Sequence, residues 1–181
     1  MNRTNALKQE ATKQGKPSNF LIFNPTNIIY FANFSGATAL FVPEEGENVL
    51  YVSGVNYEQA KSDVKGLSVE LLKRIAKHTL KKLGVDAMPM ESWRSLAKAV
   101  GGEEKLEPIN SLVRELRSVK DQEEIKLIRE ACRLAGIGME TAKEIVGVGL
   151  KEKDAAAEIE YAMRKAGSDG TAFETIVASG T

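Results

Sequence analysis

The longest regular pattern in this chain lies between Asp121 and Val146. Apolar residues recur there at alternating steps of three and four, which places them on one face of an α-helix over roughly six turns. Glu124 follows Asp121 at the spacing of a capping box. The pattern therefore predicts a helix over 121–146 that must bury one apolar stripe. The stripe consists of Ile125, Ile128, Cys132, Ala135, Met139, Ala142 and Val146.

Two kinds of partner could cover that stripe. The Ala and Cys side chains are small for a coiled-coil seam, and Gly136 and Gly138 weaken an isolated helix. Packing against a sheet is therefore favoured.

A second amphipathic helix is expected over 152–166, after a glycine-containing turn at 147–149 and with Gly167 as its stop. The apolar run 173–178 then predicts a strand, and a strand needs pairing partners. Helix, helix and strand in this order are typical of the start of an α+β unit.

The residues before about position 115 follow a different pattern. Short apolar runs bounded by Asn, Pro and Gly alternate with helical spacing, which predicts an α/β domain over residues 1–115. The expected elements are a short helix within 1–16, strands at 20–23, 67–69 and 85–88, a hairpin of 39–42 with 49–52, one or two helical turns at 56–61, a helix at 71–83 stopped by Gly84, and a helix from a Ser92 cap to Val100, ended by Gly101.

Charge and hydropathy exclude two classes of partner. Lys+Arg and Asp+Glu both count 25, so the net charge is zero and no basic excess favours nucleic acid. No apolar run approaches the roughly 20 residues that span a bilayer, and residues 1–17 lack the apolar core of a signal peptide. We therefore expect a cytoplasmic protein without a membrane partner.

Cys132, the only cysteine, is expected to be a small buried residue, and His78, the only histidine, to be structural or at the surface.

Three stretches resemble the family of Xaa-Pro dipeptidases and Xaa-Pro aminopeptidases. Residues 27–34 (NIIYFANF) are similar to the family's N-x-x-Y-L-T-G-F, and residues 116–125 (LRSVKDQEEI) to its L-R-x-x-K-[ST]-x-x-E-I. Residues 157–180, which include FETIVASG, are the closest match. Order, spacing and the length of the third stretch make the set specific. Asn33 stands where the family usually has Gly, and it tolerates a left-handed backbone. Lys151 replaces the usual Ser or Thr cap, at a cost of about 1 kcal/mol.

The resemblance implies the domain organisation. Residues 1–115 correspond to a creatinase-like α/β domain, a mixed sheet flanked by helices, and residues 116–120 to a linker. Residues 121–181 correspond to the first helices and strand of a "pita-bread" α+β peptidase domain, which is expected to be truncated in this chain.

The resemblance also implies an activity. Family members hold two divalent metal ions, such as Mn, Co or Zn, with two Asp, one His and two Glu. They hydrolyse the bond between an N-terminal residue and proline in Xaa-Pro peptides, and many are homodimers. All five ligands lie beyond the strand that 173–178 matches, so no residue of this chain corresponds to a catalytic or metal-binding position. We therefore expect the 181-residue chain alone to bind no metal and to be inactive.

A few residues remain as candidates for a site. Phe173 and Ile176 match the family strand beside the substrate pocket, so they are expected to line that pocket; the alternative is that both are ordinary sheet-core residues. The acidic pairs Glu103-Glu104 and Glu123-Glu124, and Asp169, lie at expected turns or helix starts. A surface or capping role explains these acidic residues better than a metal site.

Two other functions stay open. Creatinase, a creatine amidinohydrolase, shares both domains but uses no metal, and some pita-bread relatives have lost catalysis and serve as binding or dimerisation modules. The uncovered stripes of the two C-terminal helices predict self-association. The resemblance does not choose between dipeptidase and aminopeptidase, nor among the metals.

Overall fold

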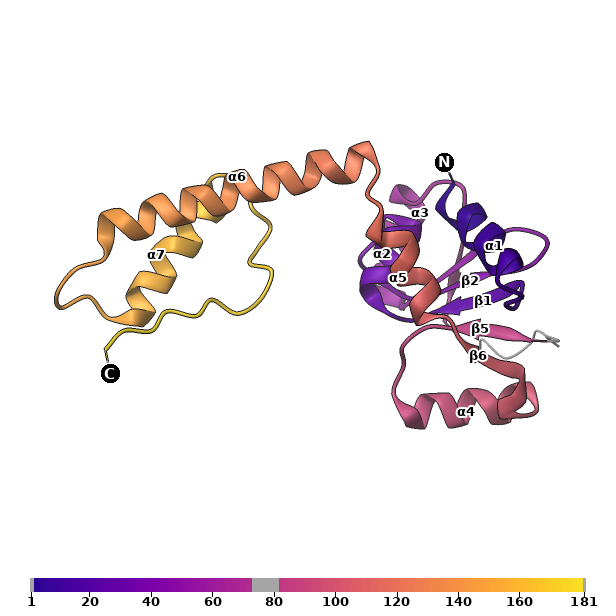
Figure 1. Ribbon diagram of the computed structural model, residues 1–181. Coiled ribbons are helices and arrows are strands. Elements are labelled where there is room, and N and C mark those ends of the chain that lie inside the picture. The colour runs from indigo at the N-terminus through magenta and orange to yellow at the C-terminus, as the bar shows by residue number, and fades with distance from the viewer. Residues whose placement is uncertain (1, 73–81, 181) are drawn as a thin grey trace. The chain divides into compact units, whose positions relative to one another are not determined.

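The computed structural model describes residues 2–72 and 82–180 (Figure 1). The chain divides into two compact units, residues 1–119 and 120–181, and each is considered by itself. Among the described residues, every helix is too short or too polar to span a bilayer.

The first unit is built on a six-stranded mixed sheet in the order β4-β3-β2-β1-β5-β6. β1 runs antiparallel to β2 and parallel to β5, and β2 and β3 form the expected antiparallel hairpin. β4 lies parallel to β3, and β6 lies parallel to β5. The mixed sheet expected from the sequence is thus confirmed. The strands are β1 (Asn19–Ile22), β2 (Ala37–Val42), β3 (Val49–Val52), β4 (Ser68–Leu71), β5 (Leu83–Val85) and β6 (Leu106–Pro108).

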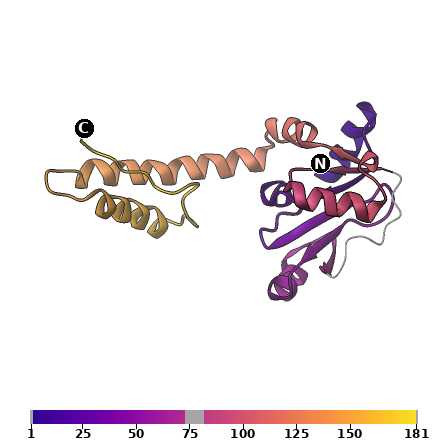
Figure 2. The same ribbon diagram turned by 90° about the horizontal axis from the view of Figure 1, so that it is seen from below.

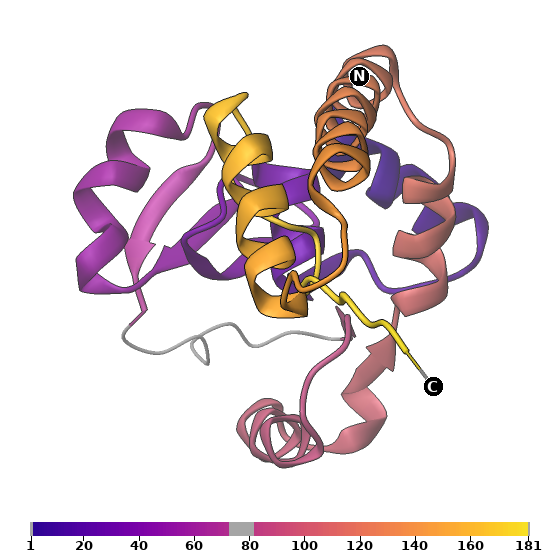
Figure 3. The same cartoon turned by 90° about the vertical axis from the view of Figure 1, so that its left-hand side faces the viewer.

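Helices cover both faces of this sheet because successive strand residues point to opposite faces. Phe20 and Ile22 face a core that includes Leu7 of α1 and Leu112 of α5, whereas Leu21 faces a core closed by α4. Figure 1 shows α4 on the opposite side of the sheet from α1, α2 and α5. Figure 3 shows α3 beside β4 at one edge, and α4 near β5 and β6 at the other. The helices are α1 (Arg3–Lys13), α2 (Pro25–Ala32), α3 (Tyr57–Asp63), α4 (Met90–Val100) and α5 (Asn110–Ser118), with single 3-10 turns at Gly54–Asn56 and Glu103–Lys105.

Local backbone chemistry sets the ends of α2. The Asn24 side chain accepts hydrogen bonds from the first turn, and Pro25 occupies the first helical position, where its missing N–H costs nothing. Asn33 ends the helix in the left-handed conformation, with φ of 51°. The expectation that Asn33 supports this turn in place of glycine is confirmed.

Gly84 has a different role from the one predicted. It was expected to stop a helix over 71–83, but it lies inside β5 beside Phe20 of β1. A Cβ at this position would lie 2.8 Å from Phe20 Cδ1 and 2.9 Å from Ile109 Cγ2. Gly84 therefore permits close packing between a strand and its neighbours.

Several other expectations in the first unit are corrected. Leu71 ends β4 and Leu83 begins β5, so the helix predicted over 71–83 is wrong at both ends; its remainder, with His78, lies outside the described residues. Ser92 is inside α4 rather than its cap, because the helix begins at Met90 after Pro89. The strand expected at 85–88 ends at Val85. The helices α2 and α5 and the strand β6 were not predicted, since all three are short segments.

The second unit consists of α6 (Gln122–Ile145) and α7 (Glu152–Lys165) packed side by side, followed by an irregular segment (Figures 1 and 2). The capping box is confirmed: Asp121 Oδ1 accepts from the Glu124 N–H at 2.8 Å, and Glu124 Oε2 accepts from the Asp121 N–H at 3.0 Å. Lys151 gives α7 no side-chain cap, as expected. Gly167 follows α7 with φ of 110°, which confirms it as the stop.

Three expectations in the second unit are wrong. Residues 173–178 form no strand, because a strand needs a paired edge and no other strand occurs within the described residues 120–180. α6 packs against α7 instead of a sheet. Cys132 is exposed, because the side of α6 that faces α7 is centred on Gly138, where a Cβ would lie 2.9 Å from Met163 Sδ. The predicted stripe is therefore largely uncovered, with Met139 63% exposed.

Candidate functional site

The two residues expected to line a pocket, Phe173 and Ile176, lie beside a hollow in the second unit. α6, α7 and residues 167–176 enclose a cavity of about 630 Å³. Its walls are mostly apolar and include Leu134 of α6 and Met163 of α7. Phe173 is 75% and Ile176 81% exposed, so neither is a sheet-core residue in this unit.

Polar contacts along α7 hold the segment that carries these two side chains. Thr175 Oγ1 donates to Glu160 Oε1 at 2.6 Å, and the Ser179 N–H donates to Glu152 Oε1 at 2.6 Å. Glu152 and Glu160 are eight positions apart, which places them about 80° apart around the axis of α7, on the same broad face of the helix. Phe173 and Ile176 are thus positioned by their neighbours rather than by their own packing.

The chemistry of this hollow is that of an apolar contact surface. One of its two acidic wall residues, Glu130, accepts hydrogen bonds from Arg133, which lower the pKa of Glu130 below its ordinary value. Throughout the described part of the chain, no group of three or more His, Cys, Asp or Glu side chains could hold a metal ion. The arrangement can receive an apolar side chain.

The remaining acidic candidates stay apart from this hollow, with the exception of Asp169. Glu103 and Glu104 form an exposed 3-10 turn, and Glu124 serves as the cap partner of Asp121. Asp169 lines the hollow at an exposed position, where its backbone oxygen accepts from Arg164. These placements agree with surface and capping roles.

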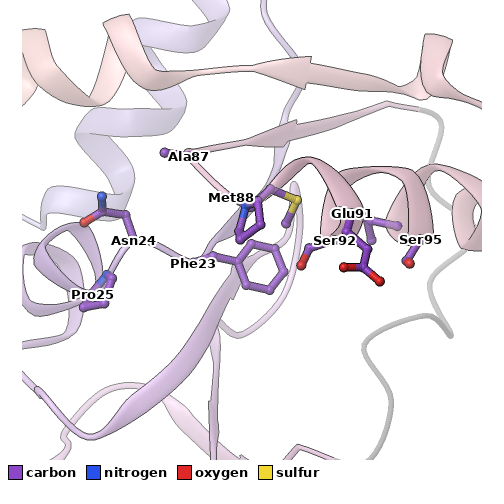
Figure 4. Close-up of a pocket in the computed structure, with 10 residues that line it drawn as sticks. Phe23, Asn24, Pro25, Ala87, Met88, Glu91, Ser92 and Ser95 are labelled. Carbon is purple, nitrogen blue, oxygen red and sulfur yellow. The ribbon is translucent and has the colours of Figure 1, made fainter.

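A second hollow, of about 610 Å³, lies in the first unit at the carboxyl ends of β1 and β5. The connection after β1, residues 87–89 and the first turns of α4 surround it. Figure 4 shows the Phe23 ring directed toward α4, with Met88 beside it and Ser92 on the facing helix. Ligands of open α/β sheets bind at carboxyl ends of strands, so this position is a reasonable place for a binding surface. No sequence pattern pointed to it.

Asp86 lies at the end of β5 and is 2% exposed. Its carboxylate accepts from the Phe23 N–H at 2.7 Å, from the Asn24 N–H at 3.1 Å and from Asn27 Nδ2 at 2.9 Å. Burial raises the pKa of Asp86, and these donors oppose the rise only in part. Because its oxygens are already occupied, Asp86 joins structural elements and is not poised as a base. The sequence signal for it was an acidic residue directly after an apolar run.

Two family models match consecutive parts of the chain. The model of the creatinase/prolidase N-terminal domain matches residues 3–119, and that of metallopeptidase family M24 matches residues 126–181. The two matches meet where the structure divides into two units.

Named relatives and solved structures agree with these matches. The chain is 32% identical over 165 residues to the Xaa-Pro dipeptidase of Pyrococcus furiosus, a match that covers 88% of this chain and 47% of the relative. The crystal structure of the prolidase from Pyrococcus horikoshii superposes with a TM-score of 0.88 at 27% identity, covering 99% of this chain and 53% of that one. The N-terminal domain of a cytoplasmic peptidase from Mycobacterium tuberculosis gives a TM-score of 0.56 at 26% identity, covering 63% and 97%. The chain spans about half the length of the curated relatives it matches.

Proposed function

The chain belongs to the creatinase/prolidase N-terminal domain family, and we propose that it serves as the N-terminal part of a metallopeptidase that cleaves Xaa-Pro peptides. The observation that carries this proposal is the order of the two matches: the M24 model begins seven residues after the first model ends. The peptidase activity of relatives such as the Pyrococcus furiosus Xaa-Pro dipeptidase supports the reaction type.

We propose the following division of roles. Residues 1–115 form the creatinase-like domain, 116–120 the linker and 121–181 the start of the peptidase domain. Support for a separate first domain comes from the Mycobacterium tuberculosis structure, which consists of an N-terminal domain alone. Because that domain comes from a cytoplasmic peptidase, we propose a cytoplasmic location for this chain as well.

The metallopeptidase match implies divalent-metal use in this family, with Mn, Co or Zn as the proposed ions. The described residues do not gather a ligand set for such ions. We therefore derive no catalytic step through a metal for this chain. Its proposed contribution is contact with the substrate: Phe173 and Ile176 would offer apolar surface to a side chain or to the proline ring of an Xaa-Pro peptide.

The proposal is tested by a chimera that joins residues 1–181 to the remaining C-terminal half of the Pyrococcus furiosus Xaa-Pro dipeptidase. We expect the chimera with Mn²⁺ or Co²⁺ to hydrolyse an Xaa-Pro dipeptide and to leave the matched Xaa-Ala dipeptide intact. The chain alone under the same conditions is the control, and it is expected to release no product. A folded, inactive chimera would contradict the peptidase proposal, and hydrolysis by the chain alone would contradict the assignment of roles.

A homodimer is a second proposal, and a specific observation favours it. The second unit exposes several large apolar side chains, with Leu127 72%, Tyr161 61% and Ile176 81% exposed. Exposed apolar surface of this kind is typical of interaction sites. Light scattering of the full chain at rising concentration should show association, and replacing Leu127 and Tyr161 with Lys should abolish it. A monodisperse monomer at high concentration would rule the proposal out.

A further inference from the structure

Three polar side chains from distant parts of the sequence meet inside the first unit. Asn27 Oδ1 accepts a hydrogen bond from Arg117 Nη1 at 2.9 Å, and Asn27 Nδ2 donates to Asp86 Oδ2 at 2.9 Å. Asp86 and Asn27 are 2% and 6% exposed, so this chain of hydrogen bonds lies largely out of water. We refer to Arg117, Asn27 and Asp86 as the relay.

The relay joins three elements that no strand pairing connects directly. Asp86 follows β5 and also accepts from the backbone N–H groups of Phe23 and Asn24 after β1. Asn27 is in the first turn of α2, and Arg117 is in the last turn of α5, two residues before the first unit ends. A contact between Tyr30 Oη and the Leu116 oxygen is 3.4 Å, long for an O–H donor. At an exposed position, Glu115 Oε2 of α5 also accepts from Gln14 Nε2 at 3.2 Å. The hydrogen bond from Arg117 to Asn27 is the shortest of these three contacts.

The donors and acceptors of the relay allow only one direction. A guanidinium has five N–H donors and no acceptor, so Asn27 must turn its oxygen toward Arg117. Its NH₂ group then points at residue 86, which must present an acceptor. The same constraint assigns the amide orientation of Asn27, which geometry alone leaves ambiguous.

We propose that Arg117, Asn27 and Asp86 form a hydrogen-bond relay of fixed direction that locks the last turn of α5, and so the point where the chain leaves the first unit, to the carboxyl ends of β1 and β5. The stretches 27–34 and 116–125, which resemble two separate family patterns, thus meet in one structural contact. Asn27 and Arg117 serve the fold through this contact. The proposal is independent of the peptidase activity.

Exchanging the residues at positions 27 and 86 tests the direction of hydrogen bonding in the relay. In Asp86→Asn, the new NH₂ group faces a donor in either orientation: the Phe23 N–H in one and the NH₂ group of Asn27 in the other. If the Asn27 amide flips to accept from residue 86, its own NH₂ group then faces the Arg117 guanidinium. In Asn27→Asp, two carboxylates face each other. In the double variant, the carboxylate introduced at position 27 would accept from both Arg117 and the new amide at position 86. The oxygen of that amide would accept from Phe23 and Asn24, so every donor regains an acceptor.

Unfolding of the full chain in urea is monitored by the fluorescence of Trp93. Trp93 is the only tryptophan of the chain and lies in the first unit. Each single variant should raise the unfolding equilibrium constant at least about tenfold, the loss expected for a buried unpaired polar group. The double variant should return to within about threefold of the unaltered chain, because its donors and acceptors are matched again. If the double variant multiplies the two single losses, or if either single variant is as stable as the unaltered chain, the proposal is overturned.

Two further variants keep the test decisive. If a single variant fails to fold, a folded double variant still supports the relay and an unfolded one overturns it. Arg117→Met should increase hydrogen exchange at the amides of residues 116–119, whereas Arg114→Met, at an exposed position of the same helix, should leave it unchanged. Equal exchange in the two methionine variants would contradict the role of Arg117.

Discussion

The two units of this chain bury their apolar residues to very different extents. In the first unit, two cores lie on opposite faces of the sheet, and side chains such as Phe20 and Leu40 are completely buried. In the described residues 120–180 of the second unit, only Gly138 and Ala155 are buried. Both units form regular helices, so local pattern is sufficient for helices. It is not sufficient for a core, because burial needs a second surface.

The largest contrast is expected from truncating one aromatic side chain in each unit. Phe20→Ala should destabilise the first unit by about 3–5 kcal/mol, because Phe20 is fully buried between the sheet and its helices. Phe173→Ala should change the stability of the second unit by no more than about 0.5 kcal/mol, because Phe173 is 75% exposed. Urea unfolding by Trp93 fluorescence and by far-ultraviolet circular dichroism measures the two. Similar losses in both variants would contradict the difference in burial between Phe20 and Phe173.

Replacing a glycine with alanine should change stability in opposite directions in the two units. Gly84→Ala would force a Cβ against Phe20 and Ile109 and should cost about 1–3 kcal/mol. Gly136 lies in α6 with no atom within 4 Å of an added Cβ, so Gly136→Ala should stabilise that helix by up to about 1 kcal/mol. Thermal unfolding of each variant checks both values. A destabilised Gly136→Ala would mean that α6 is more closely packed than the structure shows.

Helix caps should matter more in the second unit, where burial contributes little. Asp121→Ala removes the cap of α6 and should cost about 1 kcal/mol. Lys151→Ser supplies the cap that α7 lacks and should return a similar amount. Helicity measured by circular dichroism during urea titration tests the pair, and Lys153→Ser, inside α7, is the matched control, with no gain expected.

The smallest expected effect is a difference in pH dependence between the units. Burial raises the pKa of Asp86 above 3.8, so the pH-dependent part of its contribution to stability is fully present below that value and is lost as the pH rises through the raised pKa. The hydrogen bond from Arg133 lowers the pKa of Glu130 below 4.5, so its contribution is present above that value and is lost as the pH falls through the lowered pKa.

Each pH dependence is measured as the difference in unfolding free energy between the unaltered chain and a single variant. The difference for Asp86→Asn, followed by Trp93 fluorescence, should shrink as the pH rises above 3.8. The difference for Glu130→Gln, followed by circular dichroism, should shrink as the pH falls below 4.5, and high salt should weaken it because Glu130 is exposed. The same sign for both groups would contradict the stated causes.

Features that depend on neighbours along the chain could be predicted from the sequence. The capping box at Asp121 and Glu124, the left-handed Asn33 and the stop at Gly167 each require only a few consecutive residues. The β2–β3 hairpin also followed from two apolar runs around one turn. The expected mixed sheet rested on the alternation of such elements together with the family resemblance.

Features that depend on distant partners were decided only by the tertiary structure. From the sequence, Gly84 was predicted to stop a helix, but the structure places it in a strand beside the Phe20 ring. Residues 173–178 were predicted to form a strand, but no described strand of their unit pairs with them. The structural role of Asp86 depends on its hydrogen bond with Asn27, which lies 59 residues from Asp86 and 90 residues from Arg117 along the chain. Local hydrogen bonding determined the helices and turns, whereas burial and pairing across long separations determined which faces are covered and which polar groups meet.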